Sequence, residues 1–281
     1  MKYLSENRRI GNAVRRCLSI ESRIKSYFYR NSPERMVMMN KTYLKNIYRL
    51  LEKLETTQEE TIDQVAAACA ECIHHGGLLY FFGTGHSHMI CEEPFYRAGG
   101  LACIYPILET DLMLHEGASK SSGYERLEGL GNLVVSNTGL GKGDILFIAS
   151  NSGRNCAVID AAMEARKRGA STVAITSMNH TTQVTSRHSS GLNLYQVCDY
   201  VLDNGAEKGD ASVALAGLDQ KIAPTSSVMD MTLVNLILVN TVERLIEMGI
   251  KPPLFMSANT DAGDAANKAV LQTYRGRIPS L

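Results

Sequence analysis

Short apolar runs recur along the middle of the chain, and segments whose apolar residues repeat with helical spacing lie between them. A run without polar residues is typical of a strand that is buried on both faces of a parallel sheet. Five such runs with intervening helices predict an α/β fold with a doubly wound, five-stranded parallel sheet. The predicted strands are residues 78–82, 102–108, 145–149, 172–176 and 200–202.

The segment 157–168 shows the helical pattern clearly. Its alanines and Val158 fall on one face, the charged side chains fall on the opposite face, and Gly169 then gives a stop signal. Two amphipathic helices are predicted within residues 41–75, and shorter helices at 89–98 and 264–274. The apolar stripes of the first two are Tyr43, Leu44, Ile47, Leu50, Leu51 and Leu54, and Ile62, Val65, Ala66, Cys69 and Ile73.

The longest apolar segment, residues 228–248, includes Asp230, Asn235 and Glu243. Polar and charged groups within it indicate a helix of the core or of a subunit interface, and they argue against a membrane span.

Four regions are predicted along the chain: an N-terminal extension at 1–38, a helical pair at 39–76, the sheet domain at 77–250 and a tail at 251–281. Up to Arg35 the extension carries nine Lys or Arg against three Glu. A transit peptide, a nucleic-acid arm and a wrongly assigned translation start all fit this pattern, and the last interpretation is favoured. The tail would either reach a neighbouring subunit's site or cover the edge of its own sheet.

Charge and composition narrow the function. The 281 residues have a formal net charge of zero and no tryptophan, so nothing in them points to nucleic acid or to an anionic membrane as partner. Seven scattered cysteines without a signal peptide predict a cytoplasmic location. Cys69 and Cys72 form a C-x-x-C pair within a helical stretch, where packing is the favoured interpretation.

A polar turn follows the predicted strand 145–149 and leads into the helix 157–168. It reads Ser150-Asn151-Ser152-Gly153-Arg154-Asn155. Free backbone N–H groups and the helix dipole at such a turn favour an anion, and the serine hydroxyls add neutral donors. The turn therefore predicts a cradle for an organic phosphate, with a capped helix as the alternative.

A second turn of this kind follows the strand 78–82, with the residues Gly83-Thr84-Gly85-His86-Ser87. It is not a dinucleotide fingerprint, because His88 stands where the third glycine would fall, and no Walker A loop is present. The carboxyl ends of parallel strands meet at one edge of the sheet, so both turns are expected to converge there.

The two turns, in this order, resemble the glycine-rich G-x-G-x-S and S-x-S-G-x-T turns of the sugar isomerase (SIS) domain family. The resemblance covers roughly residues 40–250, and Asn155 departs from it where the family has threonine. It implies a flavodoxin-like sheet and a phosphosugar ligand. It also implies a phosphate held by Ser87, Ser150, Ser152 and Asn155, with the 83–85 backbone along the sugar. Family members include phosphosugar isomerases, an etherase and non-catalytic sensors.

The resemblance also implies proton abstraction beside C1 of an opened sugar, which requires a base, an acid and donors to the enediolate. Glu92 and Glu93 fall near the place where family enzymes carry functional acids, and neither is preferred over the other. Glu116 follows the second strand as the analogous second acid, with His115 as acid or ring opener. Solvated surface pairs are the alternative for both sites.

Three further groups of polar residues lie close to these motifs in the sequence. His86 and His88 flank Ser87 and would contact the phosphate or the sugar. With Cys91 and a glutamate they would also suit a metal ion. The spacing H-x-H-x-x-C matches no known metal site, however, and no metal is predicted. The loop 203–210, with Asp210, is expected to line the substrate, or to be a charged surface turn. Ser226 would contact the ligand or cap the long helix.

The predicted function is therefore binding of a phosphorylated amino sugar, an N-acetylhexosamine 6-phosphate, followed by isomerisation or elimination. No cofactor is expected, because the sugar's carbonyl would act as the electron sink. The protein is expected to be a homodimer or homotetramer. The alternative is a phosphosugar sensor without turnover, in which the glutamates would barely matter.

Overall fold

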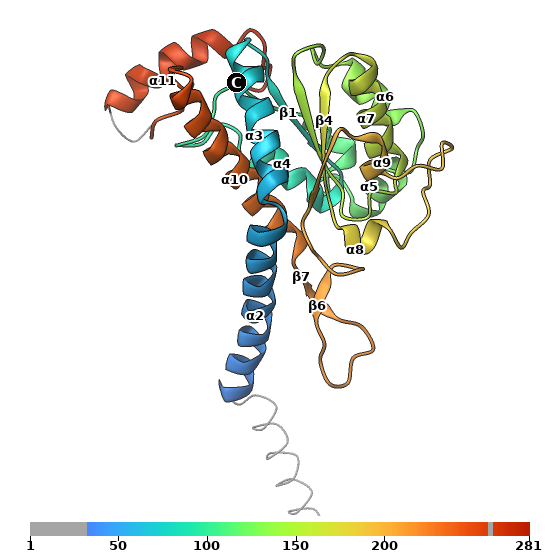
Figure 1. Ribbon diagram of the computed structural model, residues 1–281. Helices are drawn as coiled ribbons and strands as arrows, with labels where there is room; N and C mark the ends of the chain where they lie inside the picture. Colours follow the sequence, from blue (N-terminus) through green and yellow to red (C-terminus); the bar gives the residue numbers. More distant parts are fainter. Residues whose placement is uncertain (1–32, 258–260) are drawn as a thin grey trace, which may run out of the picture. The chain divides into compact units, whose positions relative to one another are not determined.

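The computed structural model describes residues 33–257 and 261–281 (Figure 1). The chain divides after Asn46 into two units, and the described part of the first, residues 33–46, is helical. Helix α2 (Pro33–Thr57) continues across the predicted boundary at residue 38 and ends in the second unit. Residues 1–32 of the predicted basic extension lie outside the described residues.

Five parallel strands form the central sheet of the second unit, in the order β2-β1-β3-β4-β5. This confirms the predicted α/β fold class. The strands are β1 (Leu79–Gly83), β2 (Ile104–Pro106), β3 (Ile145–Ala149), β4 (Ser171–Thr176) and β5 (Tyr200–Asp203). Gly83 is in register with Ala149 of the neighbouring strand, so the chain leaves β1 and β3 at adjacent points of the same edge.

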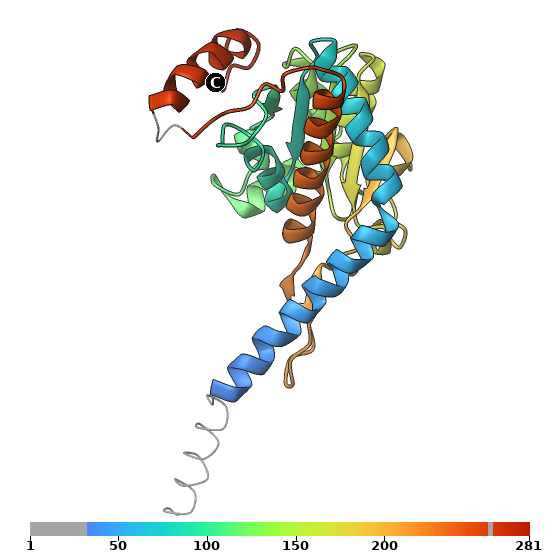
Figure 2. The same ribbon diagram turned by 60° about the vertical axis from the view of Figure 1, so that its left-hand side comes forward.

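Helices cover both faces of the sheet (Figures 1 and 2). On one side α3 (Glu59–His74) packs against α10 (Ser226–Glu247), and on the other α6 (Leu130–Ser136) packs against α7 (Cys156–Lys167). All residues of β1 and β3 are buried between these layers. None of the described helices, α10 included, is both long and apolar enough to cross a membrane.

The predicted helical stripes account for much of this packing. Every stripe residue of α3 is buried, as are Ile47, Leu50 and Leu54 of α2, whereas Leu44 is exposed. Cys69 and Cys72 are both buried in α3, and burial is the main cause that raises the pKa of the Cys72 thiol, to about 12. The apolar spacing therefore located the faces that pack onto the sheet.

The region after β1 differs from the prediction. A helix was predicted at 89–98, but the structure has a 3₁₀ turn, η1 (Gly85–His88), and one helical turn, α4 (Met89–Glu92). Pro94 has no N–H with which to continue the helix, and Tyr96 then adopts a positive φ of 45°. The following strand is also shorter than predicted.

Several short elements had no sequence signal of their own. They are the hairpin strands β6 (Ala211–Val213) and β7 (Ile222–Pro224), and the one- or two-turn helices η2 (Thr110–Leu112), α5 (Ala118–Tyr124), α8 (Met178–Thr181) and α9 (Leu194–Val197). Segments this short do not complete a recognisable period.

The tail packs on its own chain beside the edge strand β2. Leu254 forms an antiparallel bridge with Leu101, and the Ala102 N–H donates to the Pro253 carbonyl at 2.7 Å. After α11 (Asp261–Tyr274), Ile278 is fully buried and the Arg277 guanidinium donates to the Gly76 carbonyl at 2.8 Å. Of the two alternatives for the tail, the structure shows it covering its own domain.

Close packing of α6 on α7 leads to a stability prediction. A Cβ atom at Gly131 would lie 2.0 Å from the Ala157 carbonyl oxygen, so Gly131→Ala must push the two helices apart. We expect a loss of about 3 kcal/mol in the free energy of unfolding, measured by urea denaturation. Gly123→Ala in α5 is the matched control, because a Cβ there meets nothing within 4 Å. Equal stabilities of the two variants would contradict the prediction.

Candidate functional site

The turn after β3 is held in a tight conformation by its own residues. The Gly153 N–H donates to Ser150 Oγ at 3.2 Å, and Gly153 has a φ of +60°. A Cβ at this position would lie 2.9 Å from Thr181 Oγ1, so glycine is required both by conformation and by space. Ser152 is partly exposed, and its hydroxyl makes no hydrogen bond to another described residue. The turn therefore leaves the Ser152 hydroxyl accessible from solvent.

Asn155, at the end of this turn, contacts an arginine that the sequence did not single out. Its Oδ1 accepts a hydrogen bond of 2.6 Å from the guanidinium of Arg187. Burial lowers the pKa of Arg187 most, and the positive charges of Arg154 and Arg126 lower it further. Arg154 belongs to the turn itself, and its carbonyl accepts a hydrogen bond of 2.9 Å from the Arg187 N–H. Two arginines therefore lie at the turn, where positive charge favours an anion.

Two buried nitrogen atoms near the same turn have no hydrogen-bond partner among the described residues. They are Nε of Arg154 and Nδ1 of His180, which lies in α8 just after β4. Burial lowers the pKa of His180, and the nearby charges of Lys208 and Arg154 contribute, the first of them more strongly. Buried polar atoms usually find partners, so these atoms suit a polar ligand. The position of His180 after a strand end was the available sequence signal.

The turn after β1 packs closely against the strand. A Cβ at Gly83 would lie 2.4 Å from the Ser87 carbonyl oxygen, so glycine lets the η1 turn fold back onto β1. Thr84 is buried, and its hydroxyl donates to Glu125 at 2.8 Å. His86 is exposed, whereas Gly85 and Ser87 are partly exposed. The Thr84 hydroxyl is thus engaged in a hydrogen bond within the protein, and His86 and Ser87 are the accessible side chains of this turn.

The carboxylates of the neighbouring residues Glu92 and Glu93 have different partners. Glu93 forms an ion pair with Arg97 and accepts a hydrogen bond of 3.2 Å from Asn235 of α10. Glu92 instead lies beside His88, with 3.6 Å between its Oε1 and the ring Nε2. The structure thereby separates two residues that the sequence left equivalent.

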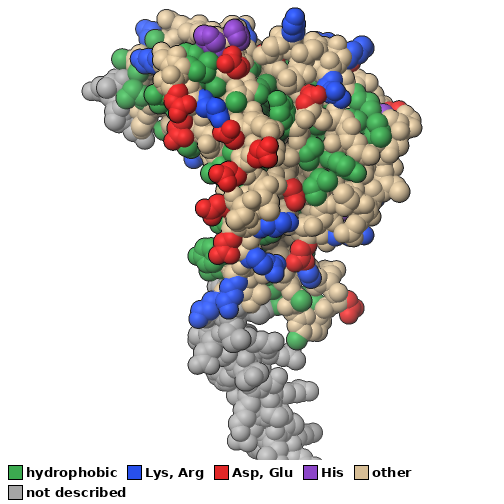
Figure 3. Space-filling model, in the orientation of Figure 1, with side chains coloured by type: hydrophobic (Ala, Val, Ile, Leu, Met, Phe, Trp, Pro, Cys, Tyr) green, Lys and Arg blue, Asp and Glu red, His purple; other side chains and the backbone are tan. Residues whose placement is uncertain are grey.

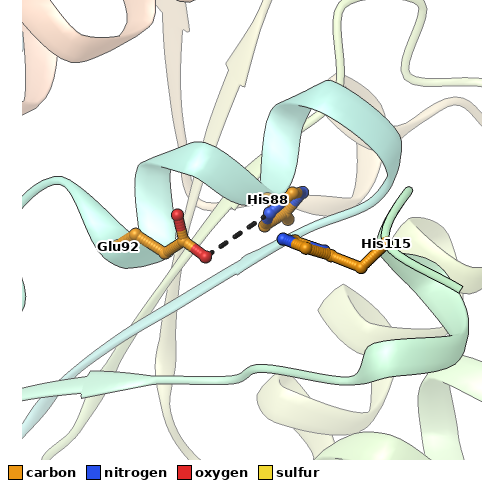
Figure 4. A group of neighbouring side chains, drawn as sticks. All are labelled: His88, Glu92 and His115. Carbon is orange, nitrogen blue, oxygen red and sulfur yellow. Dashed lines mark ion pairs between the residues drawn. The ribbon is translucent and has the colours of Figure 1, made fainter.

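His115 joins His88 and Glu92 from the loop between η2 and α5. The two imidazole rings lie edge to face with their centroids 5.3 Å apart, and the three side chains converge in Figure 4. One nitrogen of each ring and a Glu92 oxygen all lie within 4.8 Å of one another. These residues also line a pocket with His86, Met89 and Leu114. We refer to His88, Glu92 and His115 as the His–Glu–His cluster.

Glu116 is directed elsewhere, although it follows His115 directly. Its carboxylate accepts a hydrogen bond of 2.9 Å from Lys120. That hydrogen bond and the charge of Lys120 lower the pKa of Glu116. A carboxylate stabilised in its charged form is a weaker general acid. His115 and Glu116 are therefore not brought together as an acid pair.

Cys91 cannot join a metal site with the neighbouring histidines. Its thiol is fully buried and donates to the Phe81 carbonyl at 3.2 Å, and burial raises its pKa. The H-x-H-x-x-C pattern is thus not a set of converging ligands.

Asp210 and Ser226 are brought together at the start of α10. Asp210 accepts hydrogen bonds from the backbone N–H groups of Thr225 and Ser226, at 3.0 and 2.8 Å, and from the Ser226 hydroxyl at 2.6 Å. These bonds satisfy free donors at the helix N-terminus. Capping of α10 accounts for both side chains.

A buried polar chain connects the turn after β3 to α10. The side-chain amide of Asn204 donates to Asn151 Oδ1 at 3.2 Å and to Asp230 Oδ1 at 2.7 Å. Asp230 is only 3% exposed, and burial raises its pKa to about 7, although the Asn204 hydrogen bond lowers it and the charge of Asp210 raises it. This pairing joins residues 26 positions apart, and no local pattern predicts it.

Acidic side chains gather on the surface along α3 and the end of α2 (Figure 3). Its exposed acidic residues are Glu52, Glu55, Glu59, Glu60, Asp63 and Glu71. Negative charge on this face repels an anionic ligand, whereas Arg154 and Arg187 lie at the turn after β3.

Comparisons with known proteins agree with this fold. The SIS domain family matches residues 42–177. A UPF0309 protein of Listeria monocytogenes serotype 4b is 41% identical over 243 residues, covering 86% of this chain and 98% of its own. A UPF0309 protein of Halalkalibacterium halodurans is 42% identical over 232 residues, covering 83% and 96%. The structure of phosphoheptose isomerase from Neisseria gonorrhoeae has a TM-score of 0.51 and 16% identity, covering 73% of this chain and 96% of that one. This last likeness establishes the fold.

Proposed function

Because this chain belongs to the SIS domain family and groups with the UPF0309 proteins, we propose that it binds a phosphorylated sugar at the carboxyl edge of its sheet. One observation carries the proposal: the two polar turns leave adjacent strands at the same edge, and the Arg187 guanidinium contacts Asn155 at the end of the second. The structural neighbour's name also specifies a phosphorylated sugar as its substrate.

The phosphate would bind to the turn after β3. Ser152 supplies a partly exposed hydroxyl, Ser150 retains its own O–H as a donor, and Arg154 and His180 add buried nitrogen donors. Ser87 would add a hydroxyl from the turn after β1. Asn155 would bind the phosphate together with Arg187, to which it is hydrogen-bonded. Hydrogen bonds to a charged phosphate are stronger than those to neutral groups. An N-acetylhexosamine 6-phosphate is the proposed ligand.

The chemistry would take place at the His–Glu–His cluster. We assign Glu92 as the base that removes the proton beside C1 and His115 as the acid at the sugar oxygen. Glu93 is engaged with Arg97 and Asn235, and Glu116 with Lys120, so both are less suited to this step. The resulting enediolate leads to isomerisation or to elimination across C2–C3.

Proton NMR of the protein with N-acetylglucosamine 6-phosphate in D₂O tests this function. Loss of the C2 proton signal or growth of vinyl signals would support turnover and distinguish exchange from elimination. Broadened ligand signals without chemical change would support a sensor instead. An unchanged spectrum would contradict the proposed ligand.

Ser152→Ala tests the phosphate site. Removing a hydroxyl that donates to a charged group costs about 1.5–3 kcal/mol, so we expect affinity for the sugar phosphate to fall about tenfold to a hundredfold. Isothermal titration calorimetry measures the change. Ser122→Ala, at an exposed position of α5, is the matched control and should bind like the unmodified protein. Unchanged affinity in Ser152→Ala would place the phosphate elsewhere.

A further inference from the structure

We propose that the His–Glu–His cluster binds a divalent transition-metal ion, with zinc as the best fit. Two imidazole nitrogens and one carboxylate oxygen, all within 4.8 Å of one another, form a three-ligand set. Zinc is commonly held by two histidines and one glutamate, with a fourth position open to water or substrate. The donors around a tetrahedral zinc ion lie about 3.4 Å apart, so a small closure of the cluster completes the site.

His88 is already oriented as a metal ligand. Its Nδ1 contacts the Gly85 carbonyl oxygen, which can only accept, so this nitrogen carries a proton. In the neutral ring the lone pair is then on Nε2, which faces the Glu92 carboxylate. Histidines that bind metals usually donate their other ring N–H to a carbonyl or carboxylate in this way.

The distance between His88 and Glu92 supports a shared cation. The 3.6 Å between Nε2 and Oε1 is longer than a normal hydrogen bond and close to the separation of two ligands on one zinc ion. An imidazole lone pair and a carboxylate oxygen are both acceptors, so a cation between them relieves their repulsion. His115 supplies the third donor from a separate loop.

The cluster is also accessible. His88 is buried, whereas Glu92 and His115 are exposed and line the pocket with His86, Met89 and Leu114. His88 provides a fixed ligand, and the two exposed side chains can rotate towards it. The pocket leaves room for a ligand from solvent at the fourth position.

Ion binding itself does not depend on the proposed function, but the effect of the ion on proton transfer does. If Glu92 ligates through Oε1, its second oxygen stays free for the proton transfer assigned to it above. The ion would then stabilise negative charge on the sugar's carbonyl oxygen during enediolate formation, in place of the proton that His115 donates when no ion is bound.

Titration of the chelator-treated full-length protein with zinc, without sugar, tests the proposal. We expect one zinc ion per chain, and Glu92→Gln and His115→Gln should each weaken binding about tenfold or more. His75→Gln is the matched control. His75 forms a surface pair with Glu71 at 3.4 Å, so this variant removes one histidine outside the cluster and should bind zinc normally.

Cobalt provides a second measurement that does not depend on affinity. The unmodified protein should give the intense visible bands of four-coordinate cobalt(II), and His115→Gln should lose them. Equal melting temperatures in chelator would confirm that the variants are folded. Absence of stoichiometric zinc binding at micromolar concentrations would overturn the proposal, as would cluster variants that bind like the unmodified protein. Because no sugar is present, this result is independent of whether the proposed function fails.

Discussion

Glu92→Gln is expected to lower the rate of exchange at C2 of the bound sugar about 10³-fold, because glutamine cannot accept the proton. The side chain keeps its size, so affinity for the sugar phosphate, which is held by the distant turn residues, should change little. Proton NMR in D₂O gives the exchange rate, and calorimetry gives the affinity.

Glu93→Gln is the matched control for this prediction. Glu93 is adjacent in sequence, but its carboxylate is paired with Arg97 and hydrogen-bonded to Asn235. We expect this variant to retain exchange within a fewfold of the unmodified protein. Equal losses in both variants, or none in Glu92→Gln, would reject Glu92 as the base. His115→Gln, compared with and without zinc, then separates loss of an acid from loss of a ligand.

Asp230→Asn is expected to stabilise the protein above neutral pH. Burial raises the folded-state pKa of Asp230 from 3.8 to about 7, so the folded protein holds a proton that the unfolded chain releases. This contribution is fully present below about pH 4, falls between pH 4 and 7, and is lost above the folded-state pKa. A shift of this size corresponds to about 4 kcal/mol at pH 8.

The variant has no proton to lose at this position, and its side-chain oxygen can still accept the hydrogen bond from Asn204. Its advantage in the free energy of unfolding should therefore grow from near zero at pH 4 to about 4 kcal/mol at pH 8. Urea denaturation across this range measures it. Asp219→Asn, in an exposed loop, controls for the loss of one negative charge. A constant difference between Asp230→Asn and the unmodified protein at all pH values would contradict the prediction.

The fold was largely predictable from local pattern. The predicted run 145–149 matches β3, and the run 78–82 matches β1 to within one residue. Both strands are fully buried and have polar turns at their carboxyl ends. These features depend on apolar periodicity and on glycine in tight turns, and both signals lie within a few consecutive residues. The helix predicted at 89–98 failed because Pro94 interrupts a pattern whose apolar residues extend beyond it.

Side-chain partners were not predictable, because they come from residues far apart in the chain. Arg187 meets Asn155 across 32 positions, and Asp230 meets Asn204 across 26. Nothing in the local sequence around Asn155 or Asp230 indicates these contacts.

The sequence by itself determined the five strands of the sheet, the long helices that cover it and the two polar turns, since these follow from local periodicity and turn chemistry. Only the tertiary structure decided which of two adjacent glutamates faces a histidine, because Glu92 and Glu93 differ by about 100° around a helix axis. It also turned His115 towards His88 while Lys120 holds Glu116. A reactive site depends on distances between side chains, and packing of distant segments sets those distances.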